Sequence, residues 1–74
     1  MNGYDSAIIA TLRDAPEPLT VRDLVGLIDP NAEDWSAFNN IGLALTRMHR
    51  AGIVTRKRIR RDDTQRRYFA YTLL

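Results

Sequence analysis

Apolar residues recur at helical spacing near the start of the chain and predict a first helix. Residues 4–6, Tyr-Asp-Ser, offer an N-cap for it, and Pro16 prevents it from continuing, because proline lacks the N–H that a helix interior needs. The apolar stripe of this helix consists of Ala7, Ile8, Ile9 and Leu12.

A second helix is predicted after the stiff connector 16–18, Pro-Glu-Pro, with Leu19 in a short extended segment between them. Thr20, followed three residues later by Asp23, resembles a capping box in which aspartate replaces the usual glutamate. The residues expected to face the core are Val21, Leu24, Val25 and Ile28. Residues 29–31, Asp-Pro-Asn, should end the helix.

A third helix should begin near Asp34 or Ser36 and end before Gly52, a natural residue for the position after a helix cap. Its core stripe steps by three, four and three residues through Phe38, Ile41, Leu45 and Met48, flanked by Ala37, Ala44 and Ala51. At about 100° per residue the opposite face carries a different set. That set is Asn39, Leu43, Thr46, Arg47 and Arg50, with Asn40 at its margin.

Beyond Gly52 the pattern becomes extended and predicts a β-hairpin. Residues 53–55 begin a β-branched run, residues 62–65 have turn chemistry, and residues 66–73 return with three aromatic side chains. Those aromatic residues, Tyr68, Phe69 and Tyr71, are more typical of a core than of a surface that stacks on bases. We therefore expect an α+β fold in a single domain spanning residues 1–74.

The net charge of +2 conceals two oppositely charged regions. Residues 1–46 hold two arginines against seven carboxylates, a balance of −5, and residues 47–74 hold nine cations against two aspartates, a balance of +7. A chain polarised in this way can turn one face to a polyanion. With a turn at 62–65 the hairpin would place Arg61 opposite Arg66 and Arg60 opposite Arg67, a repulsion that a bound anion would relieve. Clustering on a solvated surface is the alternative reading of the charge.

The composition offers little for catalysis or metal binding. There is no cysteine and only one histidine, so a metal-ligand set is not expected, and there is no glycine-rich phosphate loop. Asp62 and Asp63 should point apart from a turn, and no nucleophile has an evident base. We expect no enzyme and no cofactor. Apolar runs such as residues 7–10 are far shorter than the about 20 residues of a membrane helix, so we expect no membrane contact.

The predicted elements follow the order helix, short extended segment, helix, helix, hairpin. Two sequence segments are characteristic, PLTVRDLV at 18–25 and LTRMHRAGIVTR at 45–56. With them the chain resembles winged helix-turn-helix regulators of the small bacterial MarR, PadR and penicillinase-repressor type. The resemblance implies that helix 36–50 enters the major groove and that hairpin 53–73 is the wing. Two departures are the long acidic connection 29–35 and the acidic wing tip at 62–63, so the sides of the wing rather than its tip should meet phosphate.

Side-chain chemistry suggests a role for each residue of the predicted interface. Arg47 could bind guanine, Asn39 or Asn40 adenine, and Leu43 a thymine methyl group, with Thr46 and Arg50 on the same face. Alternatively, Arg47 and Arg50 interact with the negative end of their own helix, and the asparagines belong to its start. The expected phosphate partners are Arg56, Lys57, Arg58, Arg60, Arg61, Arg66 and Arg67.

These features lead to two hypotheses from different classes. The first is a sequence-specific binder of double-stranded DNA, a cytoplasmic transcriptional regulator, such as a repressor, from a bacterium, phage or plasmid. The second is a winged helix used as a protein-interaction module, in which the acidic first half or Leu43 meets a partner chain. Single-stranded DNA or RNA binding is a third, weaker reading, and a homodimer or a monomer is equally compatible with the sequence.

Overall fold

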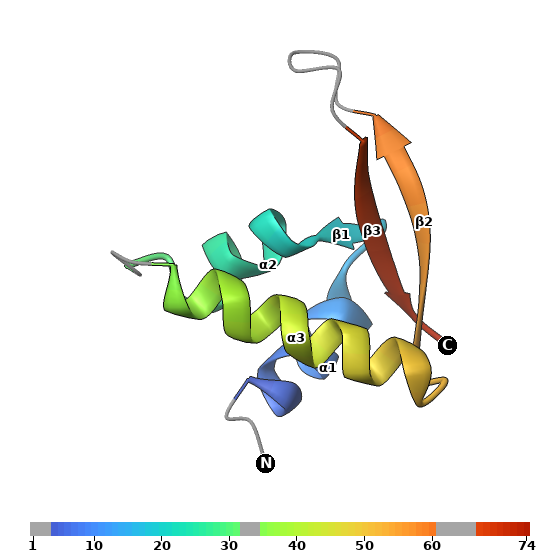
Figure 1. Cartoon of the computed structure of the whole chain (residues 1–74), viewed down its shortest axis with the longest axis horizontal. Coiled ribbons are helices and arrows are strands. Elements are labelled where there is room, and N and C mark those ends of the chain that lie inside the picture. The colour runs from blue at the N-terminus through green and yellow to red at the C-terminus, as the bar shows by residue number, and fades with distance from the viewer. Residues whose placement is uncertain (1–3, 32–34, 61–66) are drawn as a thin grey trace.

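The computed structural model describes residues 4–31, 35–60 and 67–74, apart from the side chains of Arg60 and Arg67. Within these residues the chain is α+β, as predicted, with three helices and one three-stranded antiparallel sheet (Figure 1). The elements are α1 Asp5–Asp14, β1 Leu19–Thr20, α2 Val21–Ile28, α3 Ser36–Arg50, β2 Val54–Arg60 and β3 Arg67–Leu73. This arrangement is compatible with a winged-helix layout.

Helix α1 begins at Asp5, so its N-cap is Tyr4, the first of the three residues predicted to contain it. Asp5 is already helical, and Tyr4 occupies the N-cap position without capping the helix through its side chain. The Tyr4 carbonyl accepts the first helical hydrogen bond from the Ile8 N–H at 2.9 Å. Asp5 and Ser6 therefore lie in the first turn, where the carboxylate of Asp5 interacts favourably with the positive helix end. The N-cap expected within residues 4–6 is thus backbone only.

Helix α2 confirms the capping box. The Asp23 N–H donates to Thr20 Oγ1 and the Thr20 N–H donates to Asp23 Oδ2, both at 3.1 Å. Thr20 is buried, so this reciprocal pair satisfies two polar backbone groups that would otherwise be costly to bury. It also fixes the junction between β1 and α2, which follow each other without a loop.

Helix α3 has the predicted buried stripe with two corrections. Ala37, Ile41, Ala44, Leu45 and Met48 are buried, but Phe38 is 38% exposed and Ala51 is exposed. Phe38 lies at the edge of the stripe near the helix start, and its ring packs edge-to-face on exposed Trp35, with 5.6 Å between centroids. Helical spacing identified the apolar side of α3, but it did not indicate how far the other elements cover it.

The end of α3 is a Schellman motif centred on Gly52, whose φ is +77°. The Gly52 N–H donates to the carbonyl of His49 at 3.2 Å, and the Ile53 N–H donates to the carbonyl of Met48 at 2.9 Å. Only glycine adopts this left-handed conformation without strain, so the prediction for Gly52 is confirmed. The motif joins α3 directly to β2.

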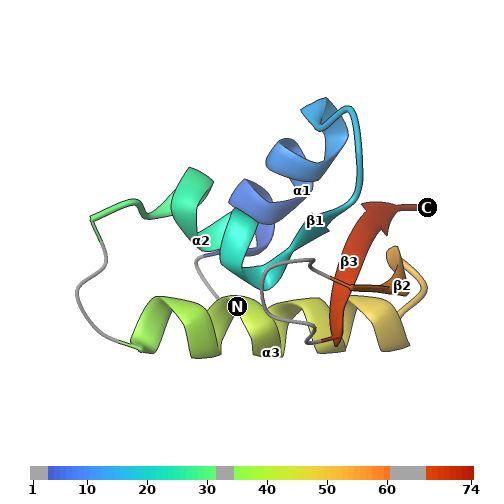
Figure 2. The same ribbon diagram turned by 90° about the horizontal axis from the view of Figure 1, so that it is seen from above.

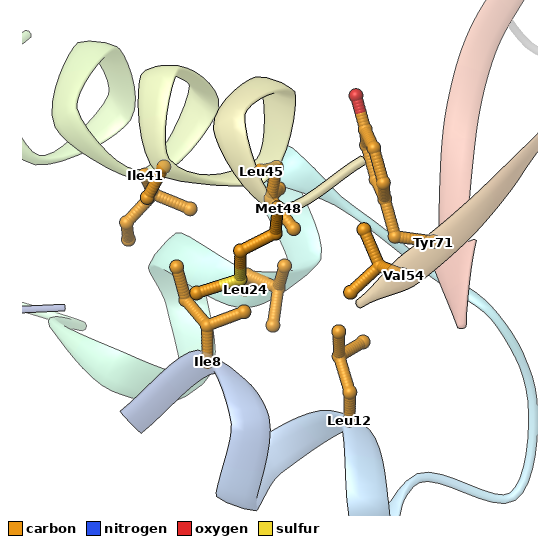
Figure 3. Close-up of a cluster of buried hydrophobic side chains, with 9 residues drawn as sticks. Ile8, Leu12, Leu24, Ile41, Leu45, Met48, Val54 and Tyr71 are labelled. Carbon is orange, nitrogen blue, oxygen red and sulfur yellow. The ribbon is translucent and has the colours of Figure 1, made fainter. Parts of the chain in front are cut away.

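The three strands pair in the order β1-β3-β2, which makes β3 the central strand. Val54 of β2 and Tyr71 of β3 are buried in the same cluster as Leu12 of α1 and Leu45 of α3 (Figure 3). One face of the sheet therefore closes the core at the C-terminal end of α3. Seen from above, α3 runs along one edge of the molecule, and α1 and α2 both lie on the same side of it (Figure 2).

Candidate nucleic-acid interface

The outward face of α3 carries the predicted set of exposed side chains. Asn39, Asn40, Arg50 and Leu43 are exposed, Leu43 by 67%. Asn39 and Leu43 are two residues from buried Ile41, and Arg50 is two residues from buried Met48, a spacing that turns each of them to the opposite side of the helix. The face is polar at its two ends and has one leucine in its middle.

Thr46 is half-buried at the margin of this face. Its hydroxyl donates to the carbonyl of Gly42, one turn earlier, at 3.0 Å. The hydroxyl proton is thus used within the helix, and the oxygen remains available as an acceptor. Thr46 can still contact a base donor or present its methyl group, but in this rotamer it offers no proton to a ligand.

Arg47 pairs with a carboxylate of α1, which the sequence did not predict. Its Nη2 lies 2.6 Å from Oδ1 and 2.7 Å from Oδ2 of Asp5, and the two side chains are 52% and 22% exposed. The contact partly neutralises the charge of Arg47 and ties α1 to α3. Because a single nitrogen makes both contacts, the Nη1 and Nε donors of the guanidinium remain outside the pair.

Arg50 differs from Arg47 in having no such partner among the residues that the structure describes. The sequence also allowed an interaction of Arg50 with the negative end of its own helix. The last carbonyls of α3, those of Arg47, Met48 and His49, already accept backbone N–H groups from the turn. Among the described residues no carboxylate pairs with Arg50, so its guanidinium remains accessible to an external anion.

The register of the hairpin separates its cations onto two faces. Arg56 is opposite buried Tyr71 and Arg58 opposite Phe69, so these arginines extend the sheet face that packs on α1 and α3. Lys57 points to the other face, where it lines an open groove with Ile59 of β2 and Arg22 of α2. The predicted phosphate partners are thus not all on one side.

Phe69 corrects the prediction that the three hairpin aromatics belong to the core. Tyr71 is buried and Tyr68 half-buried, but Phe69 is 36% exposed. The guanidinium carbon of Arg56 lies 4.2 Å from the Phe69 ring centroid, and that of Arg58 lies 5.6 Å from it. Both distances are within the about 6 Å range of cation–π interaction. Phe69 and the two arginines form what we call the wing stack.

The pairing of Arg60 with Arg67 is confirmed at the level of the backbone register. Arg61, Arg66 and the turn expected at 62–65 lie outside the described residues. Like-charged residues directly opposite each other in an antiparallel ladder are destabilising. The sequence places this pair at the end of the hairpin, which rises away from the helices (Figure 1).

Comparisons with known proteins reveal no relative: no family model, no curated protein and no solved structure matches the chain.

The described part of the chain contains no group of three or more histidine and acidic side chains that could hold a metal ion. None of the described helices has the length and apolar character needed to cross a bilayer.

Proposed function

We propose that the chain is a winged-helix protein that binds double-stranded DNA and regulates transcription by occupying an operator. The observation that carries this proposal is the position of the wing stack. It extends the sheet face that packs on α3, and its first arginine, Arg56, is three residues beyond the Schellman motif that ends α3. Exposed polar side chains of one helix and cations of an adjacent hairpin are the two components that a groove and its bordering phosphates require.

In this proposal α3 enters the major groove, which is about 12 Å wide and accepts a helix. Arg50 and Asn39 have the donors for guanine and adenine edges, and Leu43 has the apolar surface for a thymine methyl group. Arg56 and Arg58 bind phosphates without reading sequence, which fixes the orientation of α3. Lys57, on the opposite face of the hairpin, contributes only through the overall field.

The proposed biology follows from the same features. A DNA regulator acts in the cytoplasm, on the nucleoid if the source is bacterial. Operator symmetry would report whether it binds as a monomer or as a dimer, because a two-fold symmetric dimer binds two equivalent half-sites.

Titration of labelled duplex at increasing salt tests the proposal. We expect log K to fall with log salt by about 0.9 per phosphate contact, and Arg58→Ala to make the slope shallower by about one unit. Arg13→Ala is the matched control, since Arg13 is exposed at the end of α1 and the substitution removes the same charge. Absence of duplex binding by the unaltered protein at about 50 mM salt would reject the proposal.

A second candidate function is favoured by the exposed apolar side chains on and near α3. Leu43 and Trp35 are 67% and 72% exposed, so both side chains have apolar surface that a partner could bury. In a protein-interaction module they would contact a partner chain. Retention of a stoichiometric protein partner in high salt, with loss of nucleic acid, would favour this function. A higher affinity for single strands than for duplex would favour the third hypothesis, binding of single-stranded DNA or RNA.

A further inference from the structure

The wing stack explains an otherwise unfavourable feature of β3. Phe69 lies in the central strand, directly opposite Arg58, yet its ring is partly open to solvent. It shares a sheet face with buried Tyr71, two residues away, but lies beyond the end of the core. Phe69 belongs neither to the core cluster nor to the hydrophobic residues packed against it, and its ring contacts two guanidinium groups instead.

An aromatic ring orients a guanidinium in a different way from a carboxylate. A carboxylate accepts hydrogen bonds from the guanidinium and offsets its charge, as Asp5 does in part for Arg47 through the Nη2 group. A ring attracts the cation through its face, so the N–H donors and the positive charge both remain available to an anion. Stacking therefore fixes the direction of an arginine at no cost to its ability to bind phosphate.

The strand geometry makes the two arginines a pair. Arg56 and Arg58 are two residues apart on β2, so their side chains leave the same face about 6.6 Å from each other. At this distance two unpaired cations repel, and flexible side chains would separate in solution. One ring in contact with both offsets the repulsion and keeps them together, close enough to bind neighbouring phosphates of one strand.

We propose that Phe69 is a positioning residue that holds Arg56 and Arg58 as a preorganised clamp for the phosphates of a nucleic-acid backbone. This inference rests on the proposed function. Because Phe69 already orders the two arginines in the free protein, less side-chain entropy is lost when they bind phosphate. Phe69 would thus increase the affinity without itself contacting DNA.

The test compares Phe69→Leu with Phe69→Tyr, both of which keep the net charge. We expect Phe69→Leu to weaken duplex binding about three- to tenfold at about 0.15 M salt, because the arginines must then be ordered on binding. Phe69→Tyr keeps an aromatic face and should bind within about twofold of the unaltered protein. Thermal unfolding of each variant shows whether it is folded at the temperature of the titration.

A double-substitution cycle separates positioning from other roles. In a background carrying Arg56→Ala and Arg58→Ala, Phe69→Leu should have no further effect on affinity, because nothing remains to be positioned. An equal loss in both backgrounds would overturn the proposal and indicate that the ring supports the strand or stacks on a base. Equal affinity of Phe69→Leu and unaltered protein would overturn it as well.

The unliganded protein supplies a readout that does not depend on DNA. If the wing stack is populated, NMR should show upfield ring-current shifts of the Arg56 side-chain protons that disappear in Phe69→Leu. Their absence from the unaltered protein would overturn the inference even if duplex binding were strong. If instead the shifts are present and no duplex is bound, the proposed function fails, and the clamp fails with it as a nucleic-acid site.

Discussion

Arg47 on α3 and the two arginines of the wing stack differ in how much of their charge and how many of their N–H donors remain available to a ligand. On α3, Arg47 contacts the carboxylate of Asp5, which uses the Nη2 donors and offsets part of the charge. On the hairpin, Arg56 and Arg58 contact the ring of Phe69, which consumes neither. In the proposed complex the hairpin would therefore attract any polyanion, whereas Arg47 of α3 would bind only groups that are compatible with a nearby carboxylate. We infer that the hairpin supplies affinity and that α3 supplies discrimination.

The largest expected effect is the loss of both hairpin arginines. Arg56→Ala with Arg58→Ala should make the salt slope shallower by about two units and lower duplex affinity about thirtyfold at about 0.15 M salt, since two phosphate contacts are lost. Titration of one duplex at several salt concentrations measures both quantities. Combining Arg13→Ala with Arg22→Ala controls for the loss of two exposed cations elsewhere. If this control has the same effect, the hairpin is not a distinct site.

A smaller effect of opposite sign is expected at Asp5. Asp5→Asn removes a carboxylate from beside the outward face of α3 and releases Arg47, so affinity for duplexes of any sequence should rise about fivefold at about 0.15 M salt, the equivalent of one phosphate contact. Asp14→Asn makes the same charge change at the exposed far end of α1 and should have less effect. An unchanged affinity in Asp5→Asn would show that Asp5 does not restrain Arg47.

The smallest effect concerns the stability of the fold. An exposed ion pair and an exposed cation–π contact are each worth about 1 kcal/mol or less. Asp5→Asn and Phe69→Leu should therefore change the free energy of unfolding by no more than about that amount, measured by urea or heat. Leu45→Ala, which empties part of the core, should cost about 2–5 kcal/mol. A comparable cost for Phe69→Leu would make its ring a core element after all.

Local sequence rules predicted the parts of the fold that local chemistry determines. The capping box at Thr20, the Gly52 turn and the pairing of Arg60 with Arg67 each depend on residues close in sequence or on a single hairpin register. The α+β class follows from the change of period after Gly52. These rules needed no knowledge of how the elements pack.

The features that decide the candidate site depend on packing and were not predicted. Asp5 and Arg47 are 42 positions apart, and only the contact between α1 and α3 brings them together. Alternation along β3 gave Phe69 the same face as Tyr71, but it did not indicate where the core ends along that face. A signal was present in retrospect, since a strand aromatic opposite an arginine predicts a cross-strand stack.

The Schellman motif at Gly52 has a consequence for recognition. Its hydrogen bonds, together with that from the Leu74 N–H to the Ile53 carbonyl at 3.1 Å, fasten the base of the hairpin to the last turn of α3. A ligand engaged by both must accommodate one fixed offset between groove and sugar-phosphate chain. Groove width and bendability would then contribute to selectivity at base pairs that no side chain touches.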